Sequence, residues 1–341
     1  MTELPVFRLG LAGFSPAQQE EARTALRRLA TGACLWELGD FEGSDALWVN
    51  GARLQLLGQQ RVRVAPGMPS DRSLQLHLPE VDRPVAFARP VTCRDFEPAC
   101  SFELESSASV SVVLARFDAW LSPVAAQFFL ASHIVEHQTA LGSGVFEVTA
   151  NGRLLALVDM HGETAVMPTA GPSDFDEAVW RRPARPTVVP DTFARASLAQ
   201  LMWQYAVRTQ RDLLPRHYRT GSVYFRRPPR LHQRMIKDSH LLLMRELAAA
   251  PATFDALQRR TGFSESALAR DLAALYFVGT ITSNPKRAIS HQRPRRDDTP
   301  DMAQGPSSNL PSSLDSVPPS DAMLQLRGDA DQTAPAPLRP N

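Results

Sequence analysis

The chain has 341 residues, of which 43% are hydrophobic and 21% are charged, and its formal net charge is +1. That length accommodates two or three domains with buried cores, and the balanced charge excludes a general polyanion binder, so any basic surface must be local. The three cysteines, Cys34, Cys93 and Cys100, form no CxxC pair, which argues against a disulfide framework or a structural zinc site.

The N-terminal sequence, MTELPVFRLG, lacks the basic segment and apolar core that a secretory signal carries. Elsewhere no apolar run approaches the roughly 20 residues that a membrane-spanning helix needs. We therefore expect a cytoplasmic protein that has no membrane partner.

Residues 1–92 alternate between strand-like and helical segments. The apolar run at 6–14 predicts a buried strand. Ser15, Pro16 and Gln18 then have the spacing of a capping box with proline at the first helical position, which predicts a helix to about residue 30. Further strands are expected near residues 34–38, 45–50, 74–78 and 85–88. This alternation predicts an α/β domain over residues 1–92.

The order of these elements resembles the receiver domain of two-component response regulators. A working receiver has an acidic pair after its first strand to hold Mg²⁺, where this chain has LAGF at 11–14. It has a phospho-acceptor aspartate after its third strand, where this chain has Asn50, and a Lys-Pro after its fifth strand, where this chain has Arg89-Pro90. The resemblance implies a degenerate domain that receives a partner contact without accepting phosphate. A generic small α/β domain is the alternative.

Residues 93–190 are expected to form an α+β middle region. An irregular stretch precedes a predicted strand at 110–115 and a predicted helix at 117–141. Asn151-Gly152 separates two apolar runs, and a type I′ turn needs positive φ at both central residues, so a hairpin is predicted over 144–159. A proline-rich connector at 168–190, with a helical-looking segment at 174–180, closes the region.

The sequence HIVEH at 133–137 puts His133 and His137 four residues apart on one helical face, with Glu136 in the place of a general base. This pattern resembles the inverted zinc metallopeptidases, which makes a zinc-dependent hydrolase the alternative function. The main interpretation is that the two histidines are polar residues on a solvated or interdomain face, because they lie opposite the apolar stripe on a helical projection. The carboxylates considered as a third ligand are Glu147, Asp159 and Glu163.

Residues 191–284 are expected to form a helical output module that begins with an amphipathic helix at 193–209. Residues 205–237 carry nine arginine or lysine side chains and one acidic side chain. The segment has three interpretations: it contacts a phosphate backbone, it pairs with acidic residues near 97–105, or it binds an anionic small molecule. The candidate contact residues are Arg226, Arg227, Arg230, Arg234 and Lys237.

A helix-turn-helix pattern occupies residues 235–284. A first helix ends before Pro251, Thr253 has the place of the N-cap of a second helix at 254–261, and Gly262 ends that helix. Ser264 begins a third helix, and residues 280–282 are a β-prone run that predicts the start of a wing. The pattern resembles the winged-helix modules of bacterial regulators.

The free face of the third helix is expected to contain Glu265, Ser266, Ala269, Arg270 and Ala273. Ser266 and Arg270 are the candidate contact residues on it. Base edges are usually contacted by Arg, Lys, Asn or Gln, and this face has one of these. DNA and a regulatory protein partner are therefore both retained as binding partners.

Residues 285–341 are rich in proline, serine and aspartate, which predicts a disordered tail. No P-loop, dinucleotide fingerprint or nucleophile elbow occurs, so neither a cofactor nor a catalytic residue is expected. The sequence thus predicts a non-enzymatic protein of bacterial signal transduction or transcription regulation. It would combine a phosphorylation-independent receiver-like input with a winged-helix output, and a purely structural adaptor is a third interpretation.

Overall fold

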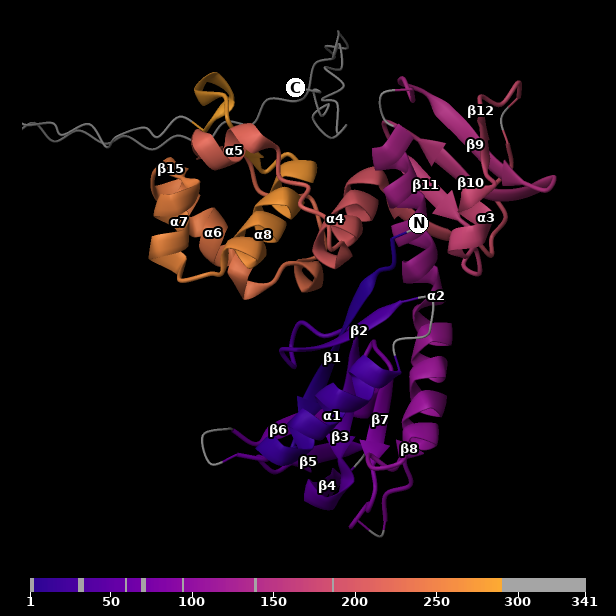
Figure 1. The fold of residues 1–341 in the computed structure, drawn as a ribbon, viewed down its shortest axis with the longest axis vertical. Coiled ribbons are helices and arrows are strands. Elements are labelled where there is room, and N and C mark those ends of the chain that lie inside the picture. The colour runs from indigo at the N-terminus through magenta and orange to yellow at the C-terminus, as the bar shows by residue number, and fades with distance from the viewer. Residues whose placement is uncertain are drawn as a thin grey trace, which may run out of the picture.

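The computed structural model of the protein describes residues 3–29, 34–58, 60–68, 72–93, 95–137, 140–185 and 187–289. Figure 1 shows three bodies. An N-terminal body contains a parallel sheet, an antiparallel sheet lies at the far end of the long helix α2, and a helical body lies beside both.

The first sheet has five parallel strands in the order β2-β1-β3-β7-β8. These strands are β1 (Val6–Ala12), β2 (Leu35–Gly39), β3 (Ala46–Asn50), β7 (Val85–Ala88) and β8 (Ser101–Phe102). The predicted capping box of α1 (Pro16–Arg28) is confirmed, because the Ser15 hydroxyl accepts from Gln18 N and the Gln18 side chain accepts from Ser15 N. The predicted α/β fold class is therefore confirmed.

Two details of the N-terminal prediction are wrong. Arg89-Pro90 follows β7, which is the fourth strand of the parallel sheet, whereas the fifth strand, β8, lies beyond residue 92. The segment near 74–78 does not join this sheet. It forms β6 (Leu74–His77) of a separate antiparallel sheet with β4 (Leu54–Gly58) and β5 (Arg61–Val64). The short helices η1 (Gly51–Arg53) and η2 (Leu78–Glu80) flank this insertion.

The insertion covers the carboxyl ends of β1 and β3. Asn50 is 5% exposed, and its Nδ2 donates to Gly13 O at 2.9 Å, while its Oδ1 accepts from Ala52 N at 3.1 Å. A Cβ atom on Gly67 would lie 2.0 Å from the carbonyl oxygen of Phe14. Ligands of doubly wound sheets bind in the crevice at this edge, and here the protein chain itself occupies it.

This close approach gives a stability prediction. We expect Gly67→Ala to lower the free energy of unfolding by about 3 kcal/mol, because the added methyl group meets main-chain atoms that cannot rotate away. Urea unfolding measures the change. Gly142→Ala is the control, because its added Cβ would meet only the mobile end of Arg182 at 3.4 Å, and it should cost less than about 0.5 kcal/mol. Equal effects of the two substitutions would contradict the prediction.

Helix α2 (Ser107–His137) joins the bodies. The predicted strand at 110–115 is wrong, since Val110, Val113 and Phe117 recur at helical spacing and pack in the core of the parallel sheet. The predicted helix at 117–141 therefore begins ten residues earlier in the structure, at Ser107, and its described part ends at His137. Despite the length of α2, none of the described helices has the length and apolar character to cross a membrane.

The second sheet is antiparallel, in the order β12-β9-β10-β11-β13. The predicted hairpin over 144–159 is confirmed as β9 (Val145–Ala150) and β10 (Arg153–Asp159), with φ of 50° at Asn151 and 75° at Gly152. The helical segment expected at 174–180 is wrong in extent, because α3 (Pro172–Asp176) is followed by strand β12 (Val179–Arg181). The remaining strands are β11 (Glu163–Val166) and β13 (Ala194–Ser197).

The helix predicted at 193–209 begins later, as α4 (Leu198–Arg208), because residues 194–197 pair with β11. It is followed by α5 (Arg216–Thr220), β14 (Ser222–Phe225) and η3 (Gln233–Met235). Helices occur at the three positions predicted, as α6 (Asp238–Ala249), α7 (Phe254–Thr261) and α8 (Glu265–Phe277). Three short strands pair in the order β15-β14-β16, with β15 at Ala252–Thr253 and β16 at Ile281–Thr282.

The predicted start of the tail, at residue 285, is too early. Helix η4 (Pro285–Arg287) follows β16, and Ile289 N donates to Phe225 O at 3.1 Å, so this stretch packs beside β14. The rest of the predicted tail lies outside the described residues.

Candidate nucleic-acid interface

The HIVEH motif lies at the end of α2 and has a packing role. His133 is 8% exposed, and its ring centroid lies 5.5 Å from that of Phe175 and 5.7 Å from that of His137. The expectation that both histidines lie on a solvated or interdomain face is therefore wrong for His133, which is buried against Phe175 of the same middle region. Burial lowers the pKa of its imidazole, which favours the uncharged ring among aromatic neighbours.

Glu136 points to a different partner. Its Oε1 accepts from Arg211 Nη2 at 2.9 Å, and Arg211 also pairs with Glu3. Within the described ranges no group of three His, Cys, Asp or Glu side chains has the arrangement of a metal site. Glu136, the general base of the alternative hydrolase, is thus engaged in an ion pair with Arg211.

Two of the predicted arginines lie at the turn between α8 and β16. The main-chain N–H groups of Arg226 and Arg227 donate to Thr280 O at 2.8 and 3.4 Å. A Cβ atom built on Gly279 would lie 3.5 Å from Arg226 Nη1 and 3.6 Å from Arg227 Nη2. Both guanidinium groups therefore flank the same glycine turn.

Two further cations lie in the stretch that the sequence predicts as the start of the tail. Lys286 and Arg287 in η4 are exposed, and the bond from Ile289 to Phe225 brings their segment beside β14. We use the name basic edge for Arg226, Arg227, Lys286 and Arg287 together with the exposed Arg230, which follows Arg227 by three residues in the chain. The Pro-Lys-Arg sequence directly after the expected wing was the signal that could have identified the last two.

The basic edge has few countercharges. Among the side chains that the structure describes, no carboxylate lies within ion-pair distance of Arg226, Arg230, Lys286 or Arg287. Clustered cations without countercharges bind phosphate backbones favourably, because binding releases condensed counterions from the nucleic acid.

Arg234 and Lys237 are instead turned toward the N-terminal body. Arg234 Nη1 lies 2.9 Å from Asp82 Oδ2. Lys237 packs against Gly43, where a Cβ atom would lie 3.1 Å from its Nζ. Burial and the neighbouring Arg8 lower the pKa of Lys237 to about 8. These two predicted contact residues therefore belong to the interface between the two bodies.

The shifted pKa of Lys237 predicts a pH dependence of stability. The unfolded side chain has its pKa at 10.5 and the folded one at about 8. Between these values the unfolded chain binds more protons, so the free energy of unfolding rises with pH across this interval. We expect Lys237→Met to flatten this rise and to add about 1 kcal/mol at pH 7, since it removes a desolvated charge. Chemical unfolding at several pH values tests this, and Lys286→Met, which removes an exposed amine, should leave the pH profile unchanged.

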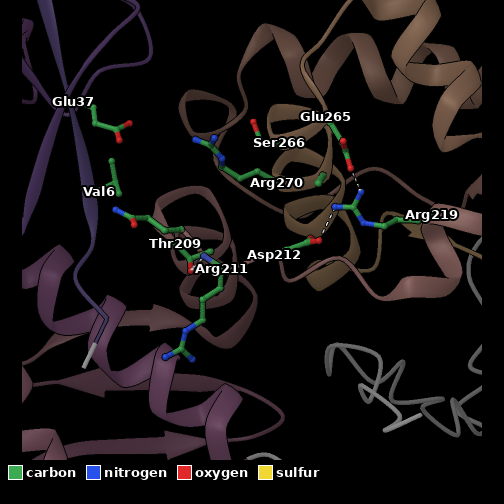
Figure 2. A pocket seen from close by; sticks show the side chains of 11 residues that line it. Val6, Glu37, Thr209, Arg211, Asp212, Arg219, Glu265, Ser266 and Arg270 are labelled. Carbon is green, nitrogen blue, oxygen red and sulfur yellow. Dashed lines mark hydrogen bonds and ion pairs between the residues drawn. The ribbon is translucent and has the colours of Figure 1, made fainter. Parts of the chain in front are cut away.

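Helix α8 offers less free surface than predicted. Ala269 and Ala273, expected on its free face, are 5% and 1% exposed, because the helix packs against α4. Ser266 and Arg270 line a cavity of about 540 Å³, and Val6 and Glu37 of the parallel sheet lie across it (Figure 2). Neither residue lies on the basic edge, so the predicted site residues divide among three places.

Comparison of the chain with protein-family models, with curated proteins and with solved structures found no match. The fold defines a mixed α/β protein with a five-stranded parallel sheet and several helices.

Proposed function

We propose that the protein is a non-enzymatic regulator of bacterial signal transduction or transcription that contacts the phosphate backbone of DNA through its basic edge. The observation that carries this proposal is that Arg226 and Arg227 flank the turn at Gly279, while the exposed Lys286 and Arg287 lie in a stretch that packs beside β14. Phosphate contacts of this kind supply most of the affinity of non-specific DNA binding.

The surrounding module is proposed to be a winged helix. Supporting this, α6, α7 and α8 follow one another with a left-handed glycine, Gly262, between the last two, and β14 lies between β15 and β16. Recognition helices of this class enter the major groove. Because α8 is largely buried, we propose that backbone contacts by the basic edge dominate and that direct base reading contributes little.

The N-terminal body is proposed to act as a receiver-like input that works without phosphorylation. Its strand order, β2-β1-β3-β7-β8, is the 2-1-3-4-5 order found in flavodoxin-like doubly wound sheets. The hydrogen bonds of Asn50 and the approach of Gly67 to Phe14 occupy the crevice in which a phosphoryl group would bind. A contact with another protein is therefore the proposed form of input.

Binding of the full chain to random duplex DNA across a salt series tests the proposal. If all five cations neutralise phosphates, log K should fall against log salt with a slope of about −4.5. Absence of binding at low salt would reject DNA as the partner, and a regulatory protein would then be the partner to seek by co-purification.

A further inference from the structure

The cavity between the parallel sheet and α8 has the size and position of a small-molecule site. Its volume is about 540 Å³, and it is lined by Val6 and Glu37 on one side and by Ser266, Ala269 and Arg270 on the other. Small-molecule sites of roughly 300–1,000 Å³ occur preferentially at boundaries between structural bodies. It is separate from the basic edge and from the occupied crevice near Asn50.

Most of the charges around the cavity are already paired. Arg219 lies 2.6 Å from Asp212 Oδ2 and 2.9 Å from Glu265 Oε1, so both carboxylates of the wall share one guanidinium (Figure 2). Arg211 is directed away from the cavity, to Glu3 and Glu136. Arg270 and Glu37 are the lining charges that have no ion-pair partner among the described residues.

Arg270 is positioned to bind an anion. No ion pair or hydrogen bond holds its guanidinium among the described residues, and in Figure 2 it extends from α8 toward the side of the cavity where Glu37 lies. Arg8 is a neighbouring cation. Burial is the largest cause that lowers the pKa of its guanidinium, and the charge of Arg270 is the second largest. Two neighbouring guanidinium groups repel each other, and an oxyanion bound at Arg270 would relieve that repulsion.

The opposite wall favours hydroxyl groups. Glu37 is exposed and has no ion-pair partner within the described ranges, so its carboxylate is free to accept hydrogen bonds. Gln210 and Ser266 add neutral donors and acceptors to the lining. Among the described residues that line the cavity none is aromatic, so they offer a nucleotide base no ring on which to stack.

We propose that this cavity binds a phosphorylated polyol of the sugar-phosphate class, with the phosphate at Arg270 and the hydroxyl groups at Glu37. Bidentate contact with a guanidinium suits a phosphate oxyanion, and a carboxylate suits sugar hydroxyls. Such a ligand contacts both β2 of the N-terminal body and α8 of the helical body. Its occupancy would therefore depend on the distance between these two bodies. The proposal does not depend on DNA binding.

Isothermal titration of the full chain with glucose 6-phosphate tests the proposal. We expect saturable binding that Arg270→Gln weakens about tenfold or more, because a charge-assisted contact is lost. The matched control is Arg245→Gln, which removes an exposed arginine of α6 and should leave binding unchanged. Thermal unfolding of each variant shows whether it retains the fold.

Further titrations separate the two halves of the site. Glu37→Gln should weaken the binding of glucose 6-phosphate but not that of inorganic phosphate. Unphosphorylated glucose should bind to the wild-type chain far more weakly than either of these two ligands. Equal affinity of wild type and Arg270→Gln, or no heat with glucose 6-phosphate, would overturn the proposal. Tighter binding of adenosine monophosphate than of the sugar phosphate would overturn the assignment to this ligand class. A chain that binds glucose 6-phosphate but no DNA would refute only the proposed function.

Discussion

Replacing Arg226, Arg227 and Arg230 with glutamine is expected to weaken binding to duplex DNA by about a hundred- to a thousandfold at 0.1 M salt. Each lost phosphate contact removes about 0.9 from the slope of log K against log salt, so the slope should become less negative by about 3. All three side chains are at least partly exposed, so the fold should tolerate the change. Fluorescence anisotropy across a salt series measures both quantities.

The control for this variant removes the same charge elsewhere. Arg27, Arg28 and Arg61 are exposed on α1 and β5, outside the basic edge. Changing these three to glutamine lowers the net charge equally and should alter the slope by less than about 1. Similar losses of DNA affinity in both triple variants would show that binding depends on the overall charge of the chain. The basic edge would then not be the contact surface.

Substitution of Asp45 by alanine is expected to lower the free energy of unfolding by about 3 kcal/mol, because one partner of a buried ion pair is lost. Asp45 forms an ion pair with Arg208, and the two side chains are 12% and 11% exposed. Its other carboxylate oxygen accepts from Arg8 N at 2.8 Å. Without this carboxylate the cations Arg8, Arg208 and Lys237 lack their shared countercharge.

Urea unfolding of Asp45→Ala and of Asp40→Ala tests this prediction. Asp40 is exposed in the same part of the N-terminal body, and its substitution should cost less than about 0.5 kcal/mol. Asp45→Ala should also make the N-terminal body and the helical body unfold at different urea concentrations, because the ion pair between Asp45 and Arg208 joins them. A loss at Asp45 no greater than at Asp40 would mean that the ion pair contributes nothing to holding the bodies together.

Local signals identified elements correctly where a few neighbouring residues decide the backbone. Ser15 and Gln18 satisfy each other's main-chain N–H groups within one helical turn, and Asn151-Gly152 adopts the two positive φ values of its turn. Such features depend on short-range hydrogen bonds and sterics. They were predicted because nothing distant in the chain competes with them.

Local signals failed where long-range packing prevailed. Val110 and Val113 are β-branched, which favours a strand, yet they belong to α2, because that helix buries them against the parallel sheet. His133 was expected on a polar face and is buried against Phe175, a residue supplied by α3. In both cases the decisive partner lies far away in the sequence.

The same division applies to the candidate site. The sequence by itself determined the fold class and the concentration of positive charge around residues 205–237. Only the tertiary structure decided which charges are available, since it turns Arg234 toward Asp82 and brings Lys286 beside β14. The physical reason is that a charge contributes to binding according to its countercharges and burial, and both depend on contacts between segments that are distant in the chain.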